Sequence, residues 1–251
     1  MPAPPSVSTL HLRPTAPLAE RVLLPGDPGR ALALAQALLV EPRMFNHHRG
    51  LWGYTGTSAE GLEITIQATG MGGPSAAIVV HELIALGARS AIRVGSCGGL
   101  HPDLGLGELV IARAAIGADG TSRALGADGR VEAHAGLAEE LERAAPAARP
   151  GTVVSVDIFY EEDLAAGAPP ATGGAPAAGL PQRHPEAIAV EMEAATLFTL
   201  GAAAAIPVGC VLAVSDTFEG PAGERRRIED HALLASSEAM GRAAIAALAA
   251  L

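Results

Sequence analysis

Residues 62–99 read LEITIQATGMGGPSAAIVVHELIALGARSAIRVGSCGG, and this stretch decides the fold class. The pattern predicts a strand over 62–68 and a buried strand over 90–94. Between them a helix is predicted over 75–86, because a proline near its start costs no hydrogen bond and Gly87 can end it. A strand, a helix and a second strand in this order indicate a layered α/β fold.

The rest of the chain continues this alternation. Further strands are predicted over 21–24, 52–58, 109–115, 152–156 and 208–214, and further helices over 30–39, 137–145, 194–205 and 224–251. Residues 165–180 are almost entirely Ala, Gly, Pro and Thr, and we interpret them as a mobile loop, because strands and helices resume after them. We therefore predict one domain over residues 1–251, a three-layer α/β/α sandwich with a mixed central sheet.

The composition excludes several classes of protein. All 17 basic residues are arginine, so a phosphate-binding loop that needs its lysine is ruled out, as is chemistry on a lysine amine. The formal net charge of −10 argues against broad nucleic-acid binding. The two cysteines do not make a disulfide framework, and the first residues lack the pattern of a signal peptide, so we expect a soluble, cytoplasmic protein.

Glycine-bearing turns follow several of the predicted strands, at 25–28, 70–73 and 95–99. Such turns at the carboxyl ends of strands let backbone N–H groups approach an anion. The second turn resembles a dinucleotide-binding fingerprint, but that site needs an acidic residue at the end of the next strand, where this chain has Arg93. The pattern therefore argues against NAD and leaves an NADP site open.

Arg93 is the most informative single residue. It lies inside the apolar strand 90–94, where a charge is not expected to be buried without a partner. Two interpretations remain: a structural ion pair, or a bound anion that Ser96 and backbone N–H groups also hold. Arg30, in the first turn of its predicted helix, can point into the same region.

Short motifs occur along the chain in one order: VLLPGDPGR (22–30), RGLWGYTG (49–56), TGMGGPS (69–75), RVGSCG (93–98), DIFY (157–160), VEMEAA (190–195) and VSD (214–216). Together they resemble the trimeric and hexameric bacterial nucleoside phosphorylases, which include purine nucleoside phosphorylase and uridine phosphorylase. The resemblance extends from about His11 to the last predicted helix.

The resemblance implies phosphorolysis, in which phosphate attacks C1′ of a nucleoside and releases ribose 1-phosphate, or its 2-deoxy form, and the free base. It implies no cofactor and no metal, with phosphate as a co-substrate. The phosphate would be held by Gly26, Arg30, Arg93 and Ser96 and by Arg49 of a neighbouring subunit, the ribose by Met71, Met192, Glu193 and a neighbour's His11, and the base by Cys97, Gly98, Phe159, Val190 and Ser215. The chain would form a homo-oligomer, which we expect to be a hexamer built as a trimer of dimers with shared sites.

Asp216 is the expected acid of this reaction. The leaving purine carries negative charge unless it is protonated, and a carboxyl group at the end of strand 208–214 is placed to supply that proton. In the purine enzymes an arginine downstream assists the aspartate, and among the arginines at 225–227 we assign Arg227. Without the resemblance, Asp216 would be a turn or cap residue, Glu193 a solvated carboxylate in a helix's first turn, and the arginines a solvated helix face.

The residues after the Phe-Tyr pair of the DIFY motif bear on the identity of the base. The uridine branch of the family recognises uracil with a glutamine and an arginine there, whereas this chain has acidic residues at 161–163. That branch also lacks an aspartate at the position of Asp216. Both differences favour purine nucleosides. Uridine phosphorylase, a nucleoside hydrolase of the same fold and a non-catalytic nucleoside-binding protein remain as alternatives.

Overall fold

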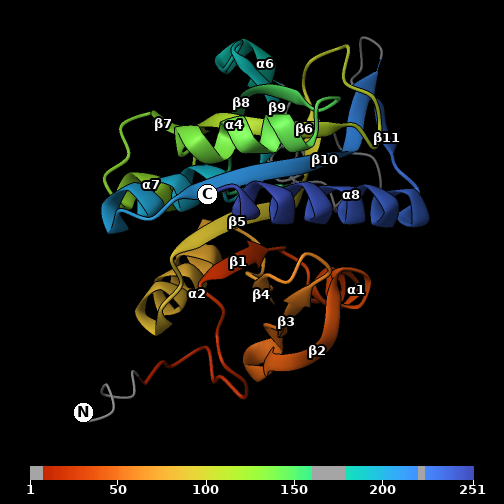
Figure 1. Ribbon diagram of the computed structural model, residues 1–251. Helices are drawn as coiled ribbons and strands as arrows, with labels where there is room; N and C mark the ends of the chain where they lie inside the picture. The colour runs from red at the N-terminus through yellow and green to blue at the C-terminus, as the bar shows by residue number, and fades with distance from the viewer. Residues whose placement is uncertain (1–7, 160–178, 220–223) are drawn as a thin grey trace.

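The computed structural model describes residues 8–159, 179–219 and 224–251, and it confirms an α/β domain with a mixed central sheet (Figure 1). Over these residues the strands lie in the order β11-β10-β6-β8-β9-β5-β1-β4-β3-β2, with β7 paired to β6 and β10 also paired to β5. The strands are β1 (Arg21–Leu24), β2 (Leu39–Asn46), β3 (Gly53–Ser58), β4 (Glu63–Gln67), β5 (Ser90–Gly99), β6 (Leu109–Gly117), β7 (Arg130–Glu132), β8 (Arg149–Ser155), β9 (Ala187–Glu191), β10 (Val208–Glu219) and β11 (Glu224–Arg227). The helices are α1 (Pro28–Leu38), η1 (His48–Gly50), α2 (Gly73–Leu86), α3 (Gly120–Ala124), α4 (Ala135–Ala144), α6 (Leu180–Arg183), α7 (Ala194–Ala204) and α8 (Asp230–Ala249).

Helices cover both faces of the sheet, as the predicted three layers require. Helices α1, α4 and α8 pack together on one face, and α2, α3 and α7 pack together on the other. Residues of β5 alternate between two hydrophobic cores, one on each face of the sheet. Ile92 and Val94 pack in the core on the α1 and α8 side, and Ala91 and Cys97 pack in the core on the α2 and α7 side. Because side chains alternate across a strand, Arg93 faces the α2 and α7 side.

Parallel pairing brings the predicted glycine turns together. β1 pairs in parallel with β4 and β5, and β5 pairs in parallel with β10, so these strands end at the same edge of the sheet. The turns after β1 and β4 are joined by hydrogen bonds from Thr69 N–H to Pro25 O at 2.9 Å and from Gly70 N–H to Gly26 O at 3.0 Å. Segments far apart in the sequence therefore form one edge.

The glycines at 95–99 do not form the predicted turn. They continue β5, because they pair with both β10 and β9. Glycine is needed at position 95 for packing rather than for turning, since a Cβ there would lie 2.7 Å from Arg93 Cζ. The strand thus carries its glycines along the edge where the sequence predicted a loop.

The predicted helix over 224–251 is wrong at its start. Residues Glu224–Arg227 form β11, which pairs antiparallel with β10, and α8 begins only at Asp230.

The sequence pattern did not predict strands β2, β7 and β9. The side chains of β2 are mostly exposed, so this edge strand lacks the alternation that identifies a half-buried one. The loop predicted over 165–180 lies almost entirely outside the described residues.

Helix α8 is the described helix that is long and apolar enough, by length and composition alone, to cross a membrane. It packs against α1 and α4 and buries Met240, Ala244 and Leu248. The core helix of a soluble protein passes the same test, so this finding is weak evidence for a membrane span.

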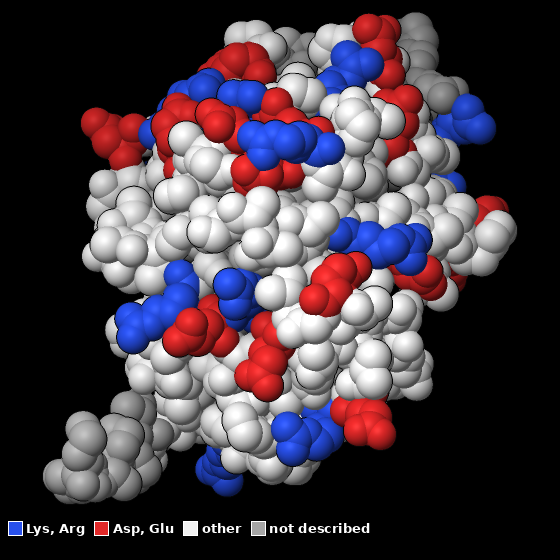
Figure 2. Space-filling view, in the orientation of Figure 1, with Lys and Arg blue, Asp and Glu red and all other residues white. Residues whose placement is uncertain are grey.

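Acidic and basic side chains are interspersed on the face of the molecule shown in Figure 2. Ion pairs at the surface include Arg113 with Glu142, with Nε and Oε1 2.5 Å apart. Nucleic-acid binding would call for a continuous basic patch, and this view of the described residues does not contain one.

Candidate active site

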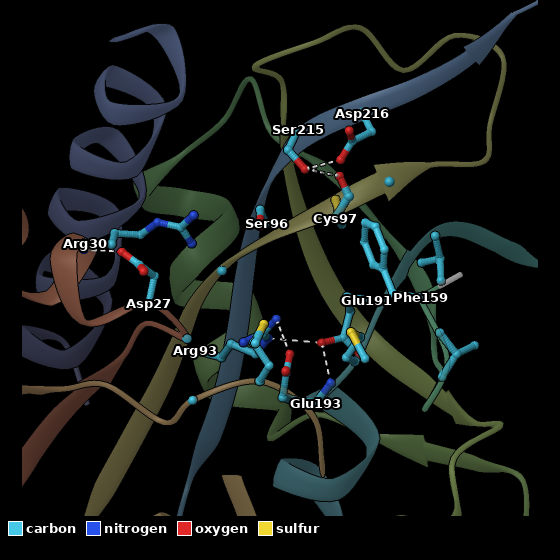
Figure 3. Close-up of a pocket in the computed structure, with 18 of the residues that line it drawn as sticks. Asp27, Arg30, Arg93, Ser96, Cys97, Phe159, Glu191, Glu193, Ser215 and Asp216 are labelled. Atoms are coloured by element: carbon cyan, nitrogen blue, oxygen red, sulfur yellow. Dashed lines mark hydrogen bonds and ion pairs between the residues drawn. The ribbon is translucent and has the colours of Figure 1, made fainter. Parts of the chain in front are cut away.

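A pocket of about 390 Å³ lies at the edge where β1, β4, β5 and β10 end (Figure 3). Its volume lies in the range of small-molecule sites. Most of the predicted site residues line it: Gly26, Arg30, Met71, Arg93, Ser96, Cys97, Gly98, Phe159, Val190, Met192, Glu193, Ser215 and Asp216. His11, Arg49 and Arg227 are absent from the lining.

The end of the pocket beside α1 is basic. Arg30 lies in the first turn of α1, where its backbone N–H donates to Oδ1 of the N-cap residue Asp27 at 2.6 Å. Burial lowers the pKa of Arg30 and the charge of Arg93 lowers it further, while Asp27 opposes this. A helix N-terminus also presents positive partial charge, so this end suits an anion such as phosphate.

Arg93 is buried between two carboxylates. Its Nε donates to Glu191 Oε2 at 3.0 Å, and its Nη2 lies 2.5 Å from Glu193 Oε2 (Figure 3). Burial opposes the charge of Arg93, but Glu193 and Glu191 together hold its pKa above the ordinary value. The structural ion pair is therefore present. A guanidinium has more N–H donors than these contacts use, so the ion pair does not prevent Arg93 from binding an anion.

Glu191 lines the pocket and was missed by the sequence reasoning. Its side chain is fully buried and accepts hydrogen bonds from Ser155 Oγ, from the backbone N–H of Glu193 at 2.8 Å and of Ala194 at 2.9 Å, and from Arg93. Burial raises the pKa of this carboxyl group, yet these neighbours all donate, which fits its ionised form. The signal that singled out Arg93, a charge in an apolar run, was also available for Glu191.

Glu193 is not the solvated carboxylate that a helix start would suggest. It is the N-cap residue of α7, yet only 4% of it is exposed. One carboxylate oxygen accepts from Gly72 N–H at 2.5 Å, and the other pairs with Arg93. Each oxygen has a further lone pair, so both can still accept a hydroxyl group. Met71 and Met192 line the same pocket.

Asp216 lies toward the other end of the pocket from Arg30 (Figure 3). Its Oδ2 lies 2.7 Å from Ser215 Oγ, which is also 3.2 Å from the carbonyl oxygen of Cys97. Its Oδ1 accepts a hydrogen bond from Arg225 Nε at 2.7 Å. The assignment of Arg227 is therefore corrected: the arginine paired with the aspartate is Arg225.

The hairpin of β10 and β11 explains how Arg225 reaches this position. In the register of the two strands, Asp216 lies opposite Arg227, and Arg225 lies opposite Phe218. The Arg225 side chain reaches back diagonally to the carboxylate, and its Cζ lies 4.8 Å from the centroid of the Phe159 ring. A cation over an aromatic face is attractive, so Phe159 favours this orientation of Arg225.

The pocket wall near Asp216 is mostly apolar. Val156, Ile158, Phe159 and Val190 line it together with Cys97. Burial and the charge of Glu191 raise the pKa of the Cys97 thiol, so the thiol remains neutral. This surface suits a flat, uncharged ring.

His11 and Arg49 lie outside the pocket, on two chain segments that contact each other. His11 Nδ1 lies 2.8 Å from Glu82 Oε1, and the carbonyl oxygen of His11 lies 3.0 Å from Nδ1 of His48. Arg49 follows in η1, exposed and with a left-handed φ of 59°. Neither residue is among the described residues that line the pocket of this chain.

The model of the phosphorylase superfamily matches residues 20–251. This chain belongs to the phosphorylase superfamily. A DeoD-type purine nucleoside phosphorylase of Caldanaerobacter subterraneus subsp. tengcongensis is 35% identical over 221 residues, which is 84% of this chain and 89% of the relative. A uridine phosphorylase of Thermococcus kodakarensis is 38% identical over 237 residues, 89% of this chain and 82% of the relative.

The fold of this chain is also that of a solved structure, uridine phosphorylase from Vibrio fischeri ES114. The two superpose with a TM-score of 0.76 at 24% identity and over 93% of each chain. At the level of the family, the chain is a nucleoside phosphorylase, a pentosyltransferase. The relatives therefore support a phosphorylase rather than the two alternatives, a nucleoside hydrolase and a non-catalytic nucleoside-binding protein.

Proposed function

We propose that this nucleoside phosphorylase acts on purine ribonucleosides and 2′-deoxyribonucleosides, with Asp216 as the proton donor to the base. The observation that carries the proposal is the buried Asp216 carboxyl group, which can bind in its protonated form and lies in contact with Arg225 beside the apolar wall. A departing purine needs a proton, and an acid fixed on a strand can deliver it. Arg225 then stabilises the carboxylate that the transfer leaves behind.

The basic end of the pocket supports a phosphate site. Arg30 and Arg93, with the backbone of Gly26 and the hydroxyl of Ser96, would supply fixed donors to a phosphate dianion. Cleavage of a glycosidic bond builds positive charge on the sugar, and the dianion stabilises that charge before it attacks C1′. We expect no metal and no organic cofactor to take part.

The ribose would lie between these two ends. Glu193 can accept sugar hydroxyls through the lone pairs that Gly72 and Arg93 leave free, and Met71 and Met192 would contact the ring. Phe159, Val190, Cys97, Gly98 and Ser215 would contact the base.

We also propose that the pocket is completed by another copy of the chain. Arg49 and His11 lie outside their own pocket, and the apolar side chains of Leu10 and Trp52, close to them in the chain, are exposed. Exposed apolar groups of this kind are typical of contact surfaces. We expect a cytoplasmic hexamer, a trimer of dimers, in which these residues reach a neighbour's phosphate and ribose. A monodisperse active monomer in light scattering would contradict this assembly.

The base is tested by incubating the enzyme with inosine, adenosine and uridine, each with and without phosphate, and by measuring the free base. The proposal expects phosphate-dependent release of hypoxanthine or adenine and little release of uracil. Faster release of uracil would favour uridine phosphorolysis, the activity for which the Thermococcus relative is named. Release without phosphate would contradict phosphorolysis altogether.

A further inference from the structure

Ser155 and Glu191 form a buried pair behind the pocket. Ser155, the last residue of β8, is fully buried, and its Oγ donates to Glu191 Oε1 while it accepts from the backbone N–H of Ala195 at 2.9 Å. Glu191 lines the pocket, but Ser155 does not. Any effect of Ser155 on a substrate must therefore pass through other residues.

Glu191 is fixed on more than one side. Besides Ser155, the backbone N–H groups of Glu193 and Ala194 at the start of α7 donate to it at 2.8 and 2.9 Å. These contacts occupy both oxygens and leave the carboxylate one orientation relative to β5. In that orientation Oε2 accepts from Arg93 Nε at 3.0 Å.

The orientation of Arg93 depends on this carboxylate. The guanidinium lies directly over Gly95, close enough that a Cβ at that residue would lie 2.7 Å from Cζ and 2.8 Å from Nη2. With Nε held by Glu191 and Nη2 by Glu193, the group cannot rotate without breaking an ion pair. Among the described residues, the Nη1 group of Arg93 has no hydrogen-bond partner, so it is free for a ligand.

We infer that Ser155 and Glu191 act as positioning residues that aim the guanidinium of Arg93 at phosphate. The inference rests on the proposed role of Arg93 as a phosphate ligand. Ser155 fixes Glu191, Glu191 fixes the Nε edge of Arg93, and the remaining edge is presented to the anion. Since a hydrogen bond to a charged group is strong, loss of either contact should weaken phosphate binding more than it slows the chemical step.

The test compares Ser155→Ala with Ser122→Ala, a matched control. Ser122 is equally buried and its Oγ donates to the buried carboxylate of Asp119 at 2.5 Å, but neither residue contacts Arg93. Ser155→Ala should raise the KM for phosphate about tenfold with kcat within about twofold, and Ser122→Ala should leave both within about twofold. The melting temperature of each variant, with and without phosphate, measures stability and phosphate binding separately.

Three further variants separate failure of the inference from failure of the proposed function: Glu191→Gln, its double variant with Ser155→Ala, and Arg93→Met. In a Glu191→Gln background, which itself should raise the KM for phosphate, Ser155→Ala should add no further change, because its effect passes through Glu191. Additive effects, or equal KM values in the two serine variants, would overturn the inference. Arg93→Met tests the proposed function instead: if it leaves phosphate binding intact, Arg93 is not a phosphate ligand.

Discussion

Arg225 Nε lies 2.7 Å from Asp216 Oδ1, although the two residues come from different strands of a hairpin. The same guanidinium lies over the ring of Phe159. One arginine therefore contacts both the expected acid and the aromatic residue expected to contact the base. Substitutions at these residues therefore test the end of the pocket at which we propose that the base binds.

Arg225→Met should lower kcat for inosine about a hundredfold, because the carboxylate that forms at Asp216 loses its charged partner. Arg227→Met is the matched control, since it removes the same group two residues away, and it should change kcat less than about twofold. Steady-state rates with saturating phosphate give both values. A larger loss in the Arg227 variant would restore the original assignment.

Asp216→Asn should lower kcat for purine nucleosides by about two to four orders of magnitude, because asparagine cannot give a proton to the base. The KM for phosphate should change little, since Asp216 lies away from Arg30 and Arg93 (Figure 3). Initial rates over a matrix of inosine and phosphate concentrations separate the two effects. Equal losses in catalysis and in phosphate binding would argue against an acid.

Gly95→Ala should raise the KM for phosphate at least about tenfold, because its Cβ would collide with the Arg93 guanidinium that Glu191 and Glu193 hold. Gly105→Ala is a suitable control, since the nearest atom to its Cβ, at 3.5 Å, is in ordinary contact. Phosphate titrations of both variants provide the measurement. If Gly95→Ala binds phosphate normally, phosphate binding does not depend on the observed position of the Arg93 guanidinium.

Co-expression of an Arg49→Ala chain with an Asp216→Asn chain should recover activity that neither variant has alone. If each site combines Asp216 from one subunit with Arg49 from another, random mixing restores about a quarter of the wild-type sites. The two chains carry different affinity tags, so that mixed oligomers can be purified and assayed. Absence of recovery in verified mixed oligomers would show that the sites are not shared.

Residues 10–12 are held against α2 by hydrogen bonds from their backbone N–H groups to the Glu82 carboxylate, and this attachment should depend on pH. Partial burial raises the pKa of the Glu82 carboxyl group, but hydrogen bonds from Leu12, His11 and Leu10 lower it by more, so the net pKa lies below the ordinary 4.5. The folded state therefore favours the ionised form. The stability that Glu82 contributes is complete above pH 4.5 and is lost as the pH falls through the lower, folded-state pKa.

Thermal unfolding between pH 7 and pH 3 tests this expectation. The melting temperature of Glu82→Gln should lie below that of the wild type at pH 7, and the gap should close at low pH. Glu60→Gln, at an exposed turn, should follow the wild type throughout. A gap that persists unchanged at low pH would mean that the charge of Glu82 does not hold the segment.

The sequence pattern was sufficient where local signals agree with tertiary packing. The strands near 21–24 and 62–68 and the helix near 75–86 are found where predicted, because their apolar residues are buried in the two cores. The glycines at 95–99 misled the prediction, because glycine is typical of turns as well as of crowded strands. What distinguishes the two is the Arg93 side chain lying over Gly95, which only the packed structure shows.

The residues of the candidate site that belong to the family's short motifs could be predicted from the sequence. Arg30, Arg93, Glu193 and Asp216 all line one pocket, as the resemblance implied. Glu191 was overlooked although it stands two residues before Glu193. The spacing from Asp216 could not choose among the neighbouring arginines, because the choice depends on the hairpin register and on Phe159.

The sequence by itself determined the fold class, the family and the residue types at the site, because alternating apolar strands and helices and short glycine-bearing motifs are local properties of the chain. The tertiary structure decided which charges pair: Arg93 with Glu191 and Glu193, and Asp216 with Arg225. The physical reason is that a buried ion pair depends on strand order, register and side-chain direction over distances of a few ångströms. Those are set by the packing of segments far apart in the sequence.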